Sequence, residues 1–134
     1  MSRKKARDHA FKLIFEIPFY GMSVEERLEL YYAQMEDKPS ERDWDYIQTV
    51  VGACFSHLDE MDKKLQGTLK NWTLERLPKV SVAILRLALC ELEQCSDIPY
   101  QVTINEAVEL AKTYGDEDTP AFINGVLANF VQQP

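Results

Sequence analysis

At residues 80–92 the sequence reads VSVAILRLALCEL, and two faces of a helix built from these residues are apolar. Each face carries an apolar residue at every third or fourth position. The two sets are Val80, Ile84, Leu87 and Ala88 on one face and Leu85, Leu89 and Leu92 on the other. A helix that is apolar on more than one side packs against neighbours on several sides. We therefore expect residues 80–92 to form the central, buried helix of the fold.

The rest of the chain also has helical periodicity, and it has no strand-like alternation of useful length. Apolar stripes predict helices over about residues 3–17, over about 23–38 and from Ser40 through Leu58. The third stripe continues to Leu69 after a bend near Asp59. Two more helices follow the proline-containing breaks at residues 97–99 and 119–120. A chain of 134 residues with this pattern predicts one all-α domain.

Several residues have the chemistry of helix boundaries. Pro18 and Gly21 are expected to end the first helix, and Ser23 and Ser40 to cap the two that follow. Residues 103–106, Thr-Ile-Asn-Glu, have the form of a capping box at the start of another helix. Gly115 is expected to end that helix in a left-handed conformation, and Thr119 to cap the last helix ahead of Pro120.

The charge of the chain is distributed unevenly. The net charge is −7, yet residues 1–12 hold five bases and one acid, a local charge of +4. The remaining residues hold 10 bases and 21 acids, a charge of −11. Arg3, Lys4 and Arg7 can share one side of the first helix, with Lys5 at its edge, and all four are expected to be free to reach phosphates. This pattern indicates a localised polyanion site on an acidic protein.

The sequence argues against an enzyme, a metal protein and a membrane protein. It has no glycine-rich phosphate loop, nucleophile elbow or zinc-protease motif, and His9 and His57 lie in different helices. Its three cysteines, Cys54, Cys90 and Cys95, form no C-x-x-C pair and are expected to be ordinary thiols without cofactor or metal. No stretch approaches the roughly 18 uncharged apolar residues of a membrane span, and the basic N-terminus lacks a signal-peptide core, so we expect a cytoplasmic protein.

Three motifs resemble the NusB family, in the family's order and spacing. They are LERLPKVSVAILRLALCEL at 74–92, IPYQVTINEAVELAKTYG at 98–115 and FINGVL at 122–127. The basic start, residues 3–7, resembles the family's arginine-rich RNA-binding segment, although lysines replace some arginines and Phe15 stands where tyrosine is frequent. Lysine keeps the charge but loses the two-pronged hydrogen bonding of arginine. The resemblance covers essentially the whole chain.

The resemblance implies a compact bundle of about seven helices in two small subdomains, at about residues 1–70 and 71–134. It implies a transcription antitermination factor that binds the boxA element of nascent ribosomal RNA leaders together with NusE, a small-subunit ribosomal protein. The pair then joins the RNA polymerase elongation complex. NusB-like domains also precede some RNA methyltransferase domains, but the four residues after Phe130 leave no room for a domain that binds a methyl donor.

Six residues are the candidate RNA-binding set. Arg3, Lys4, Lys5 and Arg7, which we call the basic arm, are expected to contact phosphates. Phe15 and Phe122 are candidates for stacking on bases, and both are equally compatible with core positions. Two alternatives stay open at this point. The chain can be a helical interaction module whose arm contacts an acidic protein, and a homodimer can cover the arm.

Overall fold

The computed structural model describes residues 2–16 and 21–131. These residues form seven α-helices and one short 3-10 helix, and they contain no β-strand. The elements are α1 (Arg3–Glu16), α2 (Val24–Gln34), α3 (Glu41–Ser56), α4 (Leu58–Thr68), η2 (Leu74–Arg76), α5 (Lys79–Gln94), α6 (Tyr100–Tyr114) and α7 (Thr119–Ala128). The predicted all-α fold of about seven helices is confirmed. Pro18, which was expected to end the first helix, lies outside the described residues.

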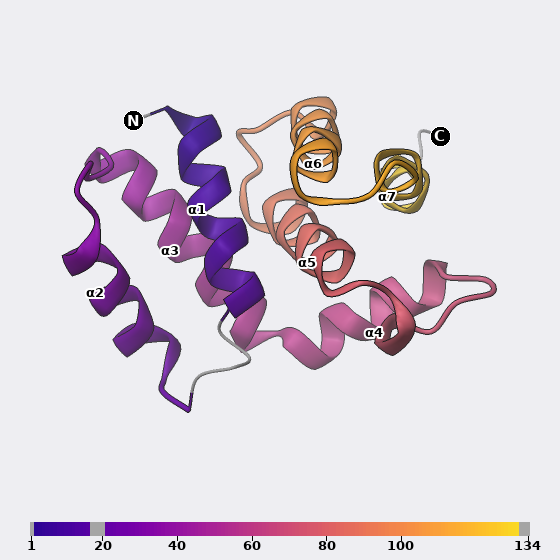
Figure 1. Ribbon diagram of the computed structural model, residues 1–134, viewed down its shortest axis with the longest axis horizontal. Helices are drawn as coiled ribbons and strands as arrows, with labels where there is room; N and C mark the ends of the chain where they lie inside the picture. The colour runs from indigo at the N-terminus through magenta and orange to yellow at the C-terminus, as the bar shows by residue number, and fades with distance from the viewer. Residues whose placement is uncertain (1, 17–20, 132–134) are drawn as a thin grey trace.

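Helix α5 lies in the middle of the fold, as Figure 1 shows, and contacts α1, α3, α4, α6 and α7. Residues of both predicted faces are buried, among them Ile84 and Leu85. Helices α1 and α3 pack together on one side of α5, with α2 against α3, and α6 and α7 pack together on another. The buried apolar residues of these helices form one continuous cluster. The central position of residues 80–92 is confirmed, and the division into two subdomains stays a prediction.

The predicted serine caps are confirmed. The Ser23 hydroxyl accepts the backbone N–H of Glu26 at 3.2 Å, and the Ser40 hydroxyl accepts that of Asp43 at 3.1 Å. These bonds satisfy backbone donors that the first turn of a helix leaves free. The bend expected near Asp59 lies at His57, between α3 and α4.

The predicted capping box at residues 103–106 is wrong. Helix α6 begins at Tyr100, after Pro99, so Thr103 lies inside the helix. The backbone N–H groups of Val102 and Thr103 bond to the Pro99 carbonyl at 3.0 and 3.3 Å. The Thr103 hydroxyl is buried and donates to the Glu91 carboxylate. The hydroxyl is thus a donor to a buried carboxylate, whereas a capping box would use it as the acceptor of a free backbone N–H, and Pro99 already has the φ that a helix start requires.

The predicted conformations at Gly115 and Thr119 are also wrong. Gly115 is extended, with φ −98° and ψ −173°, instead of left-handed. Its missing side chain matters for packing, because a Cβ there would lie 2.6 Å from the Thr119 Cβ. Thr119 is the first residue of α7, and its hydroxyl accepts the backbone N–H of Asp116 at 2.9 Å. Thr119 therefore packs against Gly115 and holds the connection between α6 and α7. It does not cap α7, contrary to the prediction from the sequence.

Two of the three thiols belong to the core. Cys54 and Cys90 are fully buried, and Cys95 is half-buried at the end of α5. A hydrogen bond with Cys54, together with burial, raises the pKa of the Cys90 thiol. Its sulfur lies 3.7 Å from that of Met61. Cys90 therefore stays protonated and packs as a small apolar side chain.

Adding a methyl group at each of two glycines should shift stability in opposite directions. Gly115→Ala should destabilise the protein by about 1–3 kcal/mol, because the new Cβ forces Thr119 to move. Gly125→Ala, in α7, meets nothing within 4 Å and should stabilise it by about 0.5–1 kcal/mol through helix propensity. Thermal unfolding followed by circular dichroism measures both. Equal shifts of the same sign would contradict the packing role of Gly115.

Candidate nucleic-acid interface

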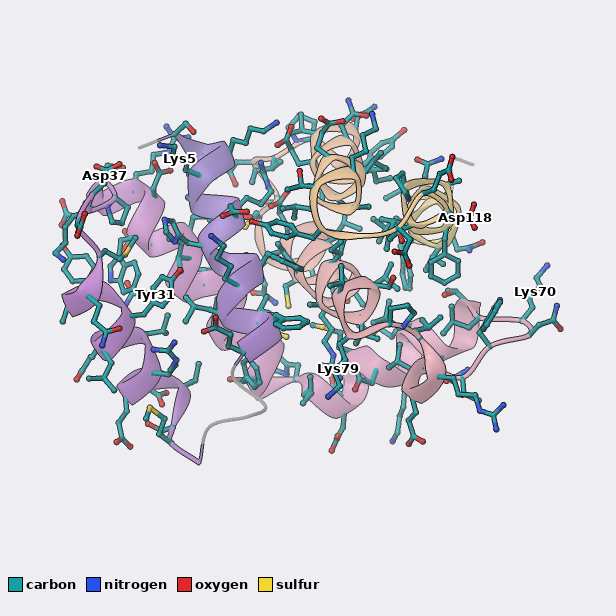
Figure 2. All side chains as sticks on the ribbon, in the orientation of Figure 1. Lys5, Tyr31, Asp37, Lys70, Lys79 and Asp118 are labelled. Carbon is teal, nitrogen blue, oxygen red and sulfur yellow. The ribbon has the colours of Figure 1, made fainter. Side chains whose placement is uncertain are left out.

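Two lysines of the basic arm are exposed at the start of α1. The Lys4 side chain is 69% exposed, and its ammonium lies 4.0 Å from a carboxylate oxygen of Glu106. Lys5 is also exposed, and Figure 2 shows it at the end of α1 where the chain begins. An exposed ion pair at such a distance contributes little. Both ammonium groups are therefore available to a polyanion.

Arg3 is partly exposed and also bonds to residues of α3. Its Nε donates to the Asp43 carboxylate at 2.9 Å, and its guanidinium lies 4.4 Å from the centre of the Tyr46 ring. Both contacts attach the start of α1 to α3. The side chain keeps 27% of its surface exposed. Arg3 can therefore approach a phosphate with part of its guanidinium while it holds the first turn of α1 in place.

Arg7 is buried, so the expectation that all four arm residues are free is wrong. Only 5% of Arg7 is exposed. Its Nε and Nη2 donate to the two oxygens of Glu91 at 2.8 and 3.2 Å, and Nη1 lies 3.7 Å from Glu106. Burial lowers the pKa of Arg7, but the hydrogen bond and the charge of Glu91 outweigh burial, so the net pKa is raised. The charge of Arg7 is neutralised inside the protein.

Glu91 accepts hydrogen bonds from three other helices. It is 1% exposed, and besides Arg7 of α1 it receives the hydroxyls of Tyr46 in α3 and Thr103 in α6. Burial and the nearby negative charge of Glu91 raise the pKa of Tyr46, which keeps its proton as a donor. One signal in the sequence points to this network: Glu91 is an acid within the helix that is apolar on two faces. A buried carboxylate requires a cation and hydrogen-bond donors.

A shallow cleft adjoins the basic arm. It has a volume of about 360 Å³ and lies among the starts of α1, α3 and α6 and the connection from α5 to α6. It is lined by Arg3, Lys4, Arg7, Arg42, Asp97, Ile98, Pro99, Val102 and Glu106. Arg42 is the residue that the sequence analysis missed, because it is 35 positions from Arg7 and lies between the acids Glu41 and Asp43. The structure thus adds a fourth base to the cleft, beside Arg3, Lys4 and Arg7 of the arm.

The two candidate aromatic residues lie apart from this cleft. Phe15 is 12 residues beyond Arg3, about 18 Å along α1, and its ring lies 6.2 Å from that of Phe11. It lines a different cavity, of about 250 Å³, together with Leu74 and Leu77. Phe122 is half-buried in α7 and packs against the core. Neither ring lines the cleft, and stacking of either on a base stays a prediction.

In residues 2–16 and 21–131, no group of three or more His, Cys, Asp and Glu side chains could hold a metal ion. None of the helices in this part of the chain is both long enough and apolar enough to cross a membrane.

The family model described as "NusB family" matches residues 4–132. The chain belongs to the NusB family. A relative named "Transcription antitermination protein NusB" from Clostridium botulinum (strain Loch Maree / Type A3) is 39% identical over 141 residues, which cover 98% of this chain and all of the relative. One of the same name from Thermoanaerobacter sp. (strain X514) is 39% identical over 132 residues, covering 98% of this chain and 91% of the relative.

Solved structures of NusB proteins have the same fold. The T. maritima NusB structure superposes with a TM-score of 0.86 at 32% identity and covers 96% of this chain and 89% of that one. A structure of antitermination factors NusB and NusE in complex with double-stranded RNA superposes with a TM-score of 0.82 at 28% identity, covering 95% of this chain and 93% of that one. The NusB-family fold expected from the three motifs is confirmed.

In this NusB-family chain, Arg7→Ala should be far more damaging than loss of a neighbouring lysine. It leaves the Glu91 carboxylate buried without its cation, which should destabilise the protein by about 3–5 kcal/mol. Lys4→Ala, on the exposed side of the same helix, should change stability by about 0.5 kcal/mol or less. Urea unfolding gives both values.

A double variant tests the cause of this loss. Arg7→Met with Glu91→Gln removes both charges, and the amide offers one acceptor oxygen and one NH2 donor to the hydroxyls of Tyr46 and Thr103. It should be clearly more stable than Arg7→Ala, because no charge is then left buried and unpaired. If Arg7→Ala unfolds at the same urea concentration as Lys4→Ala, Arg7 does not hold the helices together.

Proposed function

We propose that this chain is an RNA-binding transcription antitermination factor that acts without catalysis in the cytoplasm. It binds the boxA element of nascent ribosomal RNA leaders together with a NusE-type ribosomal protein and joins the RNA polymerase elongation complex. The observation that carries the proposal is the family match over residues 4–132, with relatives of nearly equal length named as antitermination proteins. A structural neighbour that contains NusB, NusE and RNA supports the proposed partners.

The basic arm is the proposed contact with the RNA backbone, and its four residues have different tasks. Lys4 and Lys5 are exposed and can neutralise phosphates directly. Arg3 contributes its exposed edge. Arg7 acts through its bond to Glu91, which fixes α1 and with it the direction in which the two lysines point. Phe15 and Phe122 remain proposed base contacts at other places on the surface.

The acidic remainder of the chain is proposed to favour the ribosomal partner. Residues 13–134 carry a net charge of −11. The proposed partner is a basic ribosomal protein, and complementary charge between two proteins speeds association and selects the partner. A basic partner bound beside the arm also adds phosphate contacts that this chain lacks.

Removing the two exposed lysines should lower the salt dependence of RNA binding. Each lost phosphate contact reduces the slope of log affinity against log salt by roughly 0.7 for a single strand. Lys4→Ala with Lys5→Ala should therefore reduce the slope by about 1.4, measured by fluorescence anisotropy with a single-stranded boxA-like RNA. Stability should hardly change, because both side chains are exposed.

The matched control for that variant is Lys63→Ala with Lys70→Ala. Both residues are exposed, and Figure 2 shows Lys70 far from Lys5 on the molecule. The control changes the net charge by the same amount and should leave the slope within error of wild type. Equal losses in the two variants would mean that RNA responds to the general charge of the protein and that the arm is not the site. Binding of acidic protein but not of RNA would favour the interaction-module alternative.

The ribosomal partner should tighten RNA binding. Alone, the few free cations of the arm should bind a short RNA weakly, whereas a partner that contacts both protein and RNA adds contacts within one complex. Titrating the same RNA into this chain, into the ribosomal protein and into their mixture measures the gain. Equal affinity for the chain and for the mixture would remove the cooperative part of the proposal.

A further inference from the structure

The cleft beside the basic arm has a composition of its own. Figure 1 shows the first turns of α1 and α3 and the connection from α5 to α6 along the same edge of the molecule, and residues of all three line the cleft. The cleft there holds four bases and two acids, with Ile98, Pro99 and Val102 as its apolar side. Its volume of about 360 Å³ lies at the lower end of the range for small-ligand sites, which is about 300–1,000 Å³.

Of the three arginines that line this cleft, Arg42 has the fewest contacts with carboxylates. Arg3 is paired with Asp43 and Arg7 with Glu91. Arg42 is exposed in the first turn of α3, and no salt bridge joins it to any residue of the described part of the chain. Lys4 has only the 4.0 Å contact with Glu106. An anion that enters the cleft would therefore be bound by Arg42 and Lys4.

The apolar side of the cleft includes an exposed apolar residue, whereas exposed positions are usually polar. Val102, in the first turn of α6, is 42% exposed and is one of few large apolar residues of the described chain with such exposure. It lines the cleft together with Pro99 and the four bases. A ligand that contacts both the bases and the apolar residues of the cleft must carry a negative charge and an apolar face. A nucleotide has both, in its phosphate and its base.

We propose that this cleft holds one nucleotide of the bound single-stranded RNA, with Arg42 as a phosphate contact and Val102 packed against the base. The inference rests on the proposed function and extends its site from α1 to α3 and α6. The RNA then runs from Lys4 across the start of α3. The carboxylate of Asp97, which also lines the cleft, opposes the phosphates and weakens binding.

Arg42→Ala tests the phosphate contact. The slope of log affinity against log salt should fall by roughly 0.7, so that affinity falls about fivefold at 0.1 M salt and hardly at 1 M. Arg42→Lys should keep most of the slope, since it keeps the charge. Arg76→Ala is the control, because Arg76 is an exposed arginine on η2, outside the cleft, and its loss should change neither quantity. The probe is the boxA-like RNA used with the arm variants.

Substitutions of Val102 and Asp97 should change RNA affinity in opposite directions. Val102→Thr keeps the shape but replaces a methyl group by a hydroxyl, so affinity should fall about fourfold with an unchanged salt slope. Asp97→Asn removes the opposing charge and should raise affinity at low salt. Asp59→Asn, an exposed acid of α4 and therefore the matched control, should not.

The outcomes separate this inference from the proposed function. If wild type binds RNA with the expected dependence on Lys4 and Lys5 but Arg42→Ala and Val102→Thr bind as wild type does, the cleft is not part of the RNA site. If wild type does not bind RNA at all, alone or with the ribosomal partner, the proposed function itself fails. Loss of affinity in Arg42→Ala without any change in salt slope would also overturn the phosphate contact. Urea unfolding of each variant shows that the fold is retained.

Discussion

The buried carboxylate of Glu91 is the contact on which the arrangement of the helices depends. It lies on α5, and its partners Arg7, Tyr46 and Thr103 lie on α1, α3 and α6. A buried charge is costly unless it is paired and fully hydrogen-bonded. The hydrogen bonds that satisfy this carboxylate bring the four helices to one point. Apolar packing supplies most of the stability, whereas the polar network selects which faces of the helices meet.

This network also decides what the basic arm presents to its surroundings. Arg7 is held by Glu91, and Arg3 is held by Asp43 and the ring of Tyr46. Because α1 is attached at both residues, Lys4 and Lys5 occupy the remaining, exposed side of its first turns. Preorganised side chains lose less entropy on binding than those of a flexible segment. Two arginines of the arm therefore serve the proposed RNA contact chiefly by placing the lysines.

Local features of this fold could be predicted from the sequence, whereas contacts between distant residues could not. The periodicity of residues 80–92 predicts the buried α5, and Ser23 and Ser40 mark helix starts, because each signal depends on neighbours in sequence. Arg7 was expected to be exposed because it belongs to a basic run, and its partner is 84 residues away. Thr103 has a local capping pattern, but the carboxylate of Glu91 takes its hydroxyl.

The candidate site follows the same division. The lysines of the arm were found from composition alone, because a cluster of like charges within five residues is a local signal. Arg42 could not be found in this way, since its own neighbours Glu41 and Asp43 cancel its charge in any short window of sequence. Only the packing of α3 against α1 brings it to the cleft. The group of bases at the cleft is therefore visible in the structure but not in any short stretch of the sequence.

The number of free cations is consistent with the partner in the proposed function. The arm carries four positive charges in the sequence, but Arg7 is neutralised inside the protein and Arg3 is largely paired. On the proposed track, the cations free to meet phosphates are Lys4, Lys5 and Arg42. Three contacts give a single-strand salt slope of only about 2, which corresponds to weak binding at physiological salt. The surrounding acids reduce the attraction further, so affinity must come from cations that a basic partner adds next to this end of the molecule.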